Sequence, residues 1–298
     1  MSNLYAHPAF CSALAEAVPY PEVRVLGARV FVARRYGHQH VVVPPHQGYT
    51  GFDGSPGDRL KALHALQDAF PVGRWHDGID ADPLMVMPEG MRRQDLKTYV
   101  IDFNGTPILD RWSQSPRRTL RKEQAGFLPL EPAPTEIMVD LLRGSYARHR
   151  RRLPLRSDKL SAMVTTLREV GLVEVLGIRA AAAPHPWQAT VAVLAQEREA
   201  AYWLAGSVAG PAMTVLLGQL LPRMQEEGWE RFDFAGANTP TIAEFKRRLG
   251  PKLVPYSAYT WNRGLWRGMK SIFQPIPTVV PQPPRPMSAS RMSKPNEH

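Results

Sequence analysis

Apolar positions follow two different periods along this chain, and their clearest succession lies between residues 200 and 250. Residues 201–205 form an apolar run of strand length, and residues 230–234 alternate Phe232 and Phe234 with charged residues, whereas the apolar residues after Pro211 recur at spacings of three and four. A further short helix is expected to begin after Thr239, and small residues fill the loop that follows the first strand. The segment therefore predicts the order strand, loop, helix, strand, loop, helix.

The rest of the chain mixes both periods. Amphipathic stretches predict further helices at residues 7–18, 59–70, 115–126, 137–148 and 157–171. Apolar or alternating runs predict strands at 22–26, 29–34, 39–43, 84–87, 98–103, 127–130, 172–182, 187–195 and 252–261. These elements predict an α/β fold of the α+β type with a mixed sheet.

The C-terminal segment differs in composition from the rest. Residues 274–298 hold seven prolines and few large apolar side chains. A segment that cannot bury apolar surface does not offset the entropy lost on ordering. We therefore expect residues 274–298 to form a disordered, proline-rich tail.

Composition adds a strong positive charge. The 298 residues carry a formal net charge of +10 and a pI of about 9.9, which suits nucleic acid, an anionic membrane face or a phosphate-bearing ligand such as coenzyme A. Cys11 is the single cysteine, so no internal disulfide is expected and a cytoplasmic location is favoured. The N-terminal residues lack a signal-peptide pattern, and no apolar run has the length of a membrane span.

A small-residue loop between the first strand and its helix is one candidate for chemistry. It consists of Gly206, Ser207, Val208, Ala209 and Gly210. Small residues let a ligand approach the backbone closely, and the helix start at Pro211 offers unpaired N–H groups that suit phosphate. The same residues also fit an ordinary strand-to-helix turn, so the loop alone leaves both interpretations open.

The element order of the second half resembles the GNAT acyltransferase superfamily. Over about residues 98–261 the chain is more similar to the Fem-like and CelD-like branch, whose members carry two GNAT-like domains in tandem. The matching pieces are the basic helix that ends in glycine at 117–126, Tyr146 followed by Leu153-Pro154-Leu155, Arg231-Phe232-Asp233-Phe234 before a Gly/Asn loop, and Phe245-Lys246-Arg247-Arg248-Leu249-Gly250. In the last piece, Leu249 stands where that family has an aromatic residue.

The resemblance implies a domain organisation and a co-substrate. Two tandem GNAT-like domains are expected at residues 1–132 and 133–273, the first of them degenerate. Strands 201–205 and 230–234 would splay apart to admit the pantetheine arm of acyl-CoA, and the loop 206–210 would cradle its pyrophosphate. Acyl-CoA, with acetyl-CoA as one form, is then the expected co-substrate, and the Fem-like branch also allows aminoacyl-tRNA.

Three residues are catalytic candidates. Lys246, on the last short helix, is expected to face the cleft between the splayed strands, where its charge would stabilise an oxyanion or a phosphate. Asp233 alternates with Phe232 and Phe234, so its side chain should point away from both, where it would orient an amine or act as a weak base. Asn238 offers an amide to the substrate. The structural alternatives are a surface lysine and a turn asparagine.

Four further residues are candidates for substrate binding: Arg117, Arg121, Tyr146 and Phe245. Arg117 and Arg121 are four residues apart and share one helix face, which suits an anionic acceptor or RNA phosphate but equally a solvated face. Phe245 also belongs to an apolar stripe with Ile242, which is typical of a core position.

Two hypotheses of different classes follow. The first is an acyltransferase that moves an acyl group from acyl-CoA, or an aminoacyl group from aminoacyl-tRNA, to an amine of a small molecule, glycan or peptide, in cell-envelope or polysaccharide biosynthesis. The second is a binding or scaffold protein of the same fold with a decayed site. RNA binding ranks third because it rests on charge alone, so tRNA is a less favoured partner. His38, His40 and His46 have no carboxylate or cysteine at a metal-binding spacing, so no metal is expected.

Overall fold

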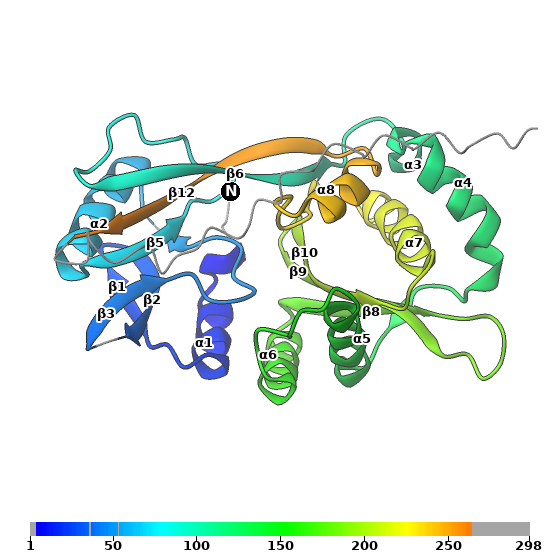
Figure 1. The fold of residues 1–298 in the computed structure, drawn as a ribbon. Coiled ribbons are helices and arrows are strands. Elements are labelled where there is room, and N and C mark those ends of the chain that lie inside the picture. The colour runs from blue at the N-terminus through cyan, green and yellow to red at the C-terminus, as the bar shows by residue number, and fades with distance from the viewer. Residues whose placement is uncertain (1–3, 36, 53, 264–298) are drawn as a thin grey trace, which may run out of the picture.

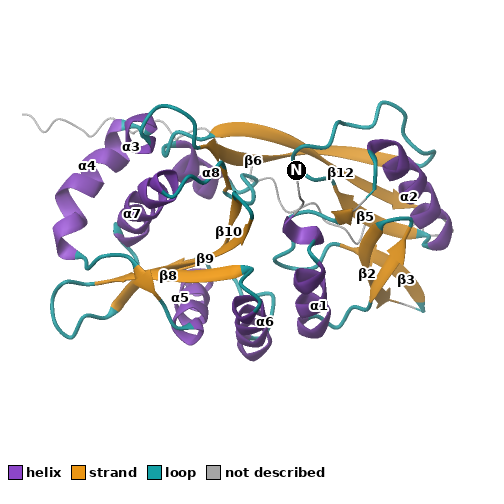
Figure 2. Ribbon diagram, turned by 180° about the vertical axis from the view of Figure 1, so that it is seen from behind, coloured by secondary structure: helices purple, strands orange, loops and turns teal. Residues whose placement is uncertain are grey.

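The computed structural model describes residues 4–35, 37–52 and 54–263, and the predicted tail at 274–298 lies outside these described residues. Within them the fold is a mixed α/β architecture built on a twelve-stranded sheet, which confirms the predicted fold class (Figure 1). Figure 2 shows the same layers from behind, with helices on both faces of the β8–β10 part of the sheet.

The strands are neighbours in the order β1-β2-β3-β5-β12-β6-β11-β10-β9-β8-β7, and β4 pairs with β2. Their bounds are β1 Glu22–Val25, β2 Ala28–Arg35, β3 His38–Val42, β4 Gly51–Phe52, β5 Val72–His76, β6 Met91–Asp102, β7 Glu131–Pro132, β8 Val173–Arg179, β9 Trp187–Gln196, β10 Glu199–Ser207, β11 Arg231–Asp233 and β12 Lys252–Asn262. The α-helices are α1 Pro8–Ala17, α2 Pro56–Ala69, α3 Ile108–Arg111, α4 Gln114–Glu123, α5 Thr135–Arg148, α6 Ser157–Glu169, α7 Ala212–Glu226 and α8 Pro240–Arg247, with 3-10 turns η1 Leu4–Ala6 and η2 Gln124–Gly126.

Two long strands, β6 and β12, run side by side across the molecule (Figure 1). They pair antiparallel from Lys252 opposite Val100 to Trp261 opposite Met91, and the far end of β12 also pairs with β5. They join the β1–β5 part of the sheet to the β7–β11 part. The last described strand, β12, therefore lies inside the sheet, between β5 and β6. The domain boundary expected between residues 132 and 133 stays a prediction.

Strands β8 and β9 are buried on both faces. On β8, Val173 and Val175 belong to one apolar cluster, whereas Leu176 and Ile178 belong to another on the opposite face. The first cluster includes buried residues of α1, α5 and α6, and the second includes residues of α3, α4 and α7. Near-continuous apolar runs in these strands follow from this double cover.

Strands β10 and β11 separate after a short parallel contact. Pairing runs only from Glu199 opposite Arg231 to Ala201 opposite Asp233, and beyond it β10 pairs with β9 alone. The predicted splay of these strands is confirmed. A β-bulge between Tyr202 and Leu204 accompanies it, and a bulge bends a strand and re-aims its side chains.

Two predicted strands differ from the structure, and one strand of the structure was not predicted. Residues 84–87 form no strand but belong to the long loop between β5 and β6, and residues 127–130 form only an isolated bridge at Phe127. Strand β5, which the sequence reasoning missed, reads Val-Gly-Arg-Trp-His and alternates poorly, because its pairing with β12 buries Gly73 against the Trp261 ring.

Candidate functional site

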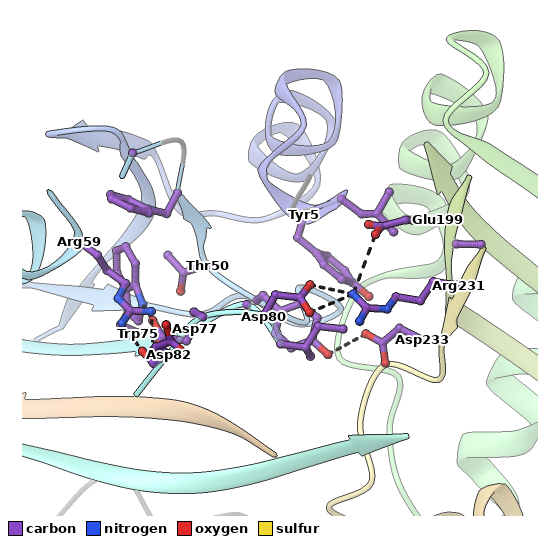
Figure 3. A pocket seen from close by; sticks show the side chains of 18 residues that line it. Tyr5, Thr50, Arg59, Trp75, Asp77, Asp80, Asp82, Glu199, Arg231 and Asp233 are labelled. Carbon is purple, nitrogen blue, oxygen red and sulfur yellow. Dashed lines mark hydrogen bonds and ion pairs between the residues drawn. The ribbon is translucent and has the colours of Figure 1, made fainter. Parts of the chain in front are cut away.

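A cavity of about 390 Å³ lies between the β1–β5 part of the molecule and the first residues of β10 and β11 (Figure 3). We call it the central cavity. Its walls come from η1, the segment around β4, the start of α2, strand β5 with the loop that follows it, the start of β10, and both ends of β11. Segments far apart in sequence therefore meet at one site of the size usual for small-molecule pockets.

Carboxylates dominate the charge of the central cavity. Five acidic and two basic residues line it: Asp77, Asp80, Asp82, Glu199 and Asp233, against Arg59 and Arg231. Three more negative than positive groups face this space, in a chain whose net charge is +10. The cavity therefore favours a cationic ligand although the whole protein favours anions.

Asp233 is a buried carboxylate held by three hydrogen bonds. Its Oδ1 accepts from Oγ1 of Thr98 at 2.6 Å and from the backbone N of Ala235 at 2.8 Å. Its Oδ2 accepts from the hydroxyl of Tyr49 at 2.7 Å. A carboxylate oxygen has two acceptor positions, so Oδ2 retains one for a further donor.

The environment of Asp233 raises its pKa. Burial is the largest cause, and it outweighs the opposing hydrogen bonds from Thr98, Tyr49 and Ala235 and the charge of Lys246. A carboxylate with a raised pKa is a better proton acceptor than an exposed one. Phe232 and Phe234 lie in the core cluster on the other face, which confirms the predicted direction of the Asp233 side chain.

The loop between β3 and β4 carries Tyr49 to Asp233. Thr50 anchors it to β5: its N donates to the carbonyl of His76 at 2.9 Å, and its Oγ1 accepts from the N of His76 at 2.9 Å. Trp203, at the bulge of β10, donates from Nε1 to the carbonyl of His46 at 2.8 Å. The loop thus contacts both β5 and β10 and brings the Tyr49 hydroxyl to the carboxylate.

Arg231 gathers carboxylates at one wall of the central cavity (Figure 3). Its Nη1 lies 2.8 Å from Oδ2 of Asp80 and 3.9 Å from Oε1 of Glu199, and its Nε lies 3.6 Å from Asp102. Burial raises the pKa of Glu199, with Arg231 opposing. Asp80 comes from the loop after β5, so this ion pair links that loop to β11.

A second cluster lies at the other end in Figure 3, formed by Arg59, Trp75 and Asp77. Nη1 of Arg59 lies 3.3 Å from Oδ2 of Asp77, and Nε1 of Trp75 donates to Oδ1 of Asp77 at 2.8 Å. A further nitrogen of Arg59 donates to the carbonyl of Asp82. Burial raises the pKa of Asp77 to about 6, against the charge of Arg59.

Lys246 is buried and tied to the backbone. Its Nζ donates to the carbonyls of Phe234 at 2.6 Å and Gly236 at 2.8 Å, and it lies 5.5 Å from the ring centre of Tyr202. The side chain is 6% exposed, so the surface-lysine alternative is wrong. Lys246, Tyr202 and Phe234 occupy the opening between β10 and β11, and the lysine holds the loop that follows Asp233.

The loop 206–210 lies at the other end of β10 from the central cavity. Ser207 is eight residues beyond Glu199, which corresponds to roughly 26 Å along a strand. A Cβ on Gly206 would lie 2.2 Å from the backbone N of Leu142, so this glycine lets β10 pack closely on α5. At Gly210, with φ +121°, no atom lies within 4 Å of such a Cβ, and Val208 and Ala209 are partly or fully exposed. The phosphate role of this loop stays a prediction.

The remaining predicted residues lie outside the central cavity. Oδ1 of Asn238 accepts from the N of Lys97 at 3.2 Å, which suits a turn residue. Phe245 packs against the core cluster of α7, and Tyr146 packs against that of α5 and α6. Arg117 and Arg121 are on α4, at the edge of the molecule (Figure 1). Of the predicted residues, the structure brings only Asp233 into the cavity.

Two features are absent from residues 4–35, 37–52 and 54–263. No group of three or more His, Cys, Asp or Glu residues there is placed to hold a metal ion. No helix in the same ranges combines the length and apolar character that crossing a membrane requires.

Comparison with known proteins finds relatives in structure alone. No protein-family model and no curated protein matches this chain. The structure of FemX matches with a TM-score of 0.56 at 12% identity, over 86% of this chain and 92% of FemX. L-PGS from Bacillus licheniformis matches with a TM-score of 0.55 at 17% identity, over 86% and 88%. The C-terminal domain of an Agrobacterium fabrum protein named as a putative lysylphosphatidylglycerol synthetase matches with a TM-score of 0.54 at 14% identity. The match covers 85% of this chain and 87% of that domain.

At these identities the likeness is one of fold. The chain shares the fold of FemX and of the two lysylphosphatidylglycerol-synthetase structures, in agreement with the Fem-like fold that its sequence resemblance implied. The tandem domains and the CelD-like branch stay predictions.

Sequence reasoning missed most of the cavity. Tyr49, Thr98 and Glu199 belong to no motif, and only the folded sheet brings them near Asp233. One signal was present: the loop after β5 reads Asp77-Gly78-Ile79-Asp80-Ala81-Asp82, an acidic run in a basic chain. All six of its residues line the central cavity.

Proposed function

We propose that this protein transfers an acyl or aminoacyl group to a primary amine held in the central cavity, with Asp233 as the proton acceptor. One observation carries the proposal: Asp233 is buried, oriented by Tyr49 and Thr98, and keeps one acceptor position at a cavity rich in carboxylates. Such a cavity attracts an ammonium group, and a carboxylate of raised pKa removes its proton.

The reaction balances with the groups at hand. The amine nitrogen attacks the carbonyl carbon of the donor, and a C–N bond forms while the bond to the leaving oxygen or sulfur breaks. One proton of the ammonium group passes to Oδ2 of Asp233 before attack, which leaves the neutral amine. A second proton, lost from the nitrogen after attack, passes to the leaving oxygen or sulfur, which departs as an alcohol or thiol, and Asp233 then returns its proton to solvent. Lys246 acts in this scheme as a positioning residue, because two of its three N–H groups bind the carbonyls of Phe234 and Gly236.

Two donors fit this chemistry, and different features support each. The splay of β10 and β11 and the loop 206–210 support acyl-CoA. Against this, Tyr202, Phe234 and Lys246 fill the opening of the splay.

Aminoacyl-tRNA is supported by an exposed basic segment beside the end of β10. Arg148 donates to the carbonyl of Ser207, and Arg150, Arg151 and Arg152 after it are exposed. Guanidinium groups on a surface suit RNA phosphates.

The test is product formation with defined donors. The purified protein is incubated with primary amines and either a panel of acyl-CoA thioesters or charged tRNA, and acylated amines are detected by mass spectrometry. Gly210→Glu should abolish transfer from acyl-CoA alone, whereas the paired change Arg150→Ser and Arg151→Ser should weaken transfer from tRNA alone and reduce its salt dependence. Folded protein that transfers from neither donor would contradict the proposal and favour a binding or scaffold role.

A further inference from the structure

The central cavity has two chemically different ends. At the end of Arg231, the carboxylates Asp80, Glu199 and Asp233 outnumber the single guanidinium, so this end is anionic. At the other end in Figure 3, Arg59 and Asp77 form a close ion pair and neutralise each other. A ligand that spans the cavity therefore meets negative charge at one end and a neutral pair at the other.

The Arg59–Asp77 pair has hydrogen-bonding capacity that the described part of the chain does not use. Nε of Arg59 donates no hydrogen bond, and Oδ2 of Asp77 accepts none, although it lies 3.3 Å from Nη1 of Arg59. Both residues are nearly fully buried, at 6% and 2% exposure, and both line the cavity. Oδ2 of Asp77 has an ion-pair partner but receives no hydrogen bond, and Nε of Arg59 has no acceptor among the described residues. Unused hydrogen-bonding capacity of buried atoms costs free energy, which a ligand with the matching group recovers.

The unused atoms define the group that fits them. One donor beside one acceptor matches a neutral group that both accepts and donates a hydrogen bond, namely a carboxamide or a hydroxyl. A carboxylate would meet the acceptor of Asp77, and an ammonium would meet the donor of Arg59, so neither charged group satisfies both atoms. The rings of Trp75 and Phe52 line the same end and supply apolar contact.

We propose that the acceptor is a bifunctional amine, with its ammonium group at the Asp80–Glu199–Asp233 end and a carboxamide or hydroxyl at the Arg59–Asp77 pair. Amino-acyl amides and peptides carry an amine and a carboxamide, and amino sugars and amino alcohols carry an amine and a hydroxyl. This inference rests on the proposed function, because it names the substrate class of the same cavity. It adds the Arg59–Asp77 pair as a recognition site, which the transfer reaction alone does not require.

The test measures binding without any donor, so it is independent of catalysis. Three series of linear amines are titrated calorimetrically into the full-length protein: ω-amino amides, ω-amino alcohols and plain alkylamines of equal chain length. At one chain length the amide or the alcohol should bind about 10-fold more tightly than the alkylamine, since a hydrogen bond with a charged partner contributes about that much. N-acetylation of the amine should remove binding in every series.

Variants then locate the effect. Arg59→Met and Asp77→Asn should each bring amide, alcohol and alkylamine to equal affinity, while Lys61→Met, an exposed position on the same helix, should leave the preference unchanged. Because the ligand series is measured on the wild-type protein, it decides the question even where a variant does not fold.

Each outcome has a distinct meaning. A preference for the amide assigns peptide-like acceptors, and a preference for the alcohol assigns sugar-like ones. If alkylamines bind as tightly as the amino amides and amino alcohols at every chain length, this inference is overturned and the proposed function stands. Amines that bind with the stated preference but are never acylated would overturn the proposed function instead, and a folded protein that binds no amine would overturn both.

Discussion

The hydroxyl of Tyr49 donates a 2.7 Å hydrogen bond to Oδ2 of Asp233 across 184 positions of sequence. Both side chains are buried, and burial raises the pKa of each. The contact joins the loop between β3 and β4 to the end of β11. It therefore orients the Asp233 carboxylate and also holds the β1–β5 part of the sheet against the β7–β11 part.

Tyr49→Phe should therefore lower the free energy of unfolding by about 1.5–3 kcal/mol, the usual worth of a hydrogen bond to a charged group. It should also raise the pKa of Asp233 further, because the bond from Tyr49 favours the ionised carboxylate. Urea unfolding and the pH dependence of amine acylation check both parts. Tyr146→Phe, outside the cavity, is the matched control, and equal losses in the two variants would contradict the prediction.

Lys246 should make the protein more stable in mildly alkaline solution. Burial lowers the pKa of Lys246 to about 8, whereas an unfolded lysine keeps its proton to about 10.4. Between these values the unfolded state binds more protons, so the free energy of unfolding rises with pH, by about 3 kcal/mol in all.

Urea unfolding between pH 7.5 and 9.5 measures this rise, and Lys246→Met should lack it. Lys252→Met, at an exposed position, should keep the wild-type dependence of the free energy of unfolding on pH. The buried tyrosines are present in all three proteins, so they do not contribute to the difference between them. Parallel slopes in wild type and Lys246→Met would show that the lysine is not buried as a charged group.

The two glycines that bound the loop 206–210 should respond differently to alanine. Gly206→Ala places a Cβ 2.2 Å from the N of Leu142, so α5 must move away from β10 at a cost of about 3 kcal/mol. Gly210→Ala meets no atom within 4 Å and should cost about 1–2 kcal/mol, through its φ of +121° alone. Thermal unfolding compares the pair, and an equal cost at both positions would argue against close packing at Gly206.

Acid should weaken the loop that carries Tyr49, through His46. Burial lowers the pKa of His46 to about 4, below the unfolded value of about 6.5. As the pH falls between these values, the unfolded state takes up the proton first, so about 3 kcal/mol of stability is lost. His46→Asn suits the left-handed backbone there, with φ of 66°, and should reduce the loss measured by urea unfolding at pH 7 and pH 5.

The quantity to measure is the difference in the free energy of unfolding between wild type and His46→Asn at each pH. Asp77 is present in both proteins and changes stability with pH in the opposite direction, so its contribution cancels in this difference. Its raised pKa, about 6, gives stability that decreases as the pH rises. An unchanged difference across this range would mean that His46 does not stay neutral in the folded protein.

The second half of the fold was predictable because its strands are buried on both faces and its helices carry clean apolar stripes. The periods at β8, β9, α6 and α7 follow directly from that burial. Strand β5 was not predictable, since Gly73 and Arg74 interrupt its pattern and only pairing with β12 defines it.

The same contrast holds for the site. The direction of Asp233 could be predicted from the alternation of one strand, whereas its partners Tyr49 and Thr98 come from other segments that only tertiary structure brings together. Lys246 was correctly placed between the splayed strands, but its two backbone acceptors depend on how the loop after β11 turns, which no sequence pattern specified.

The most direct test of the central claim is the rate of amine acylation in Asp233→Asn beside wild type, at saturating amine. The asparagine can keep its Oδ1 toward Thr98 and Ala235 and turn its amide to Tyr49, so the fold should survive. If Asp233 accepts the amine proton, the rate should fall at least 100-fold while amine binding changes little, and Asp140→Asn, at an exposed position on α5 outside the cavity, should stay near wild type. A folded Asp233→Asn protein that acylates amines at the wild-type rate would contradict the account.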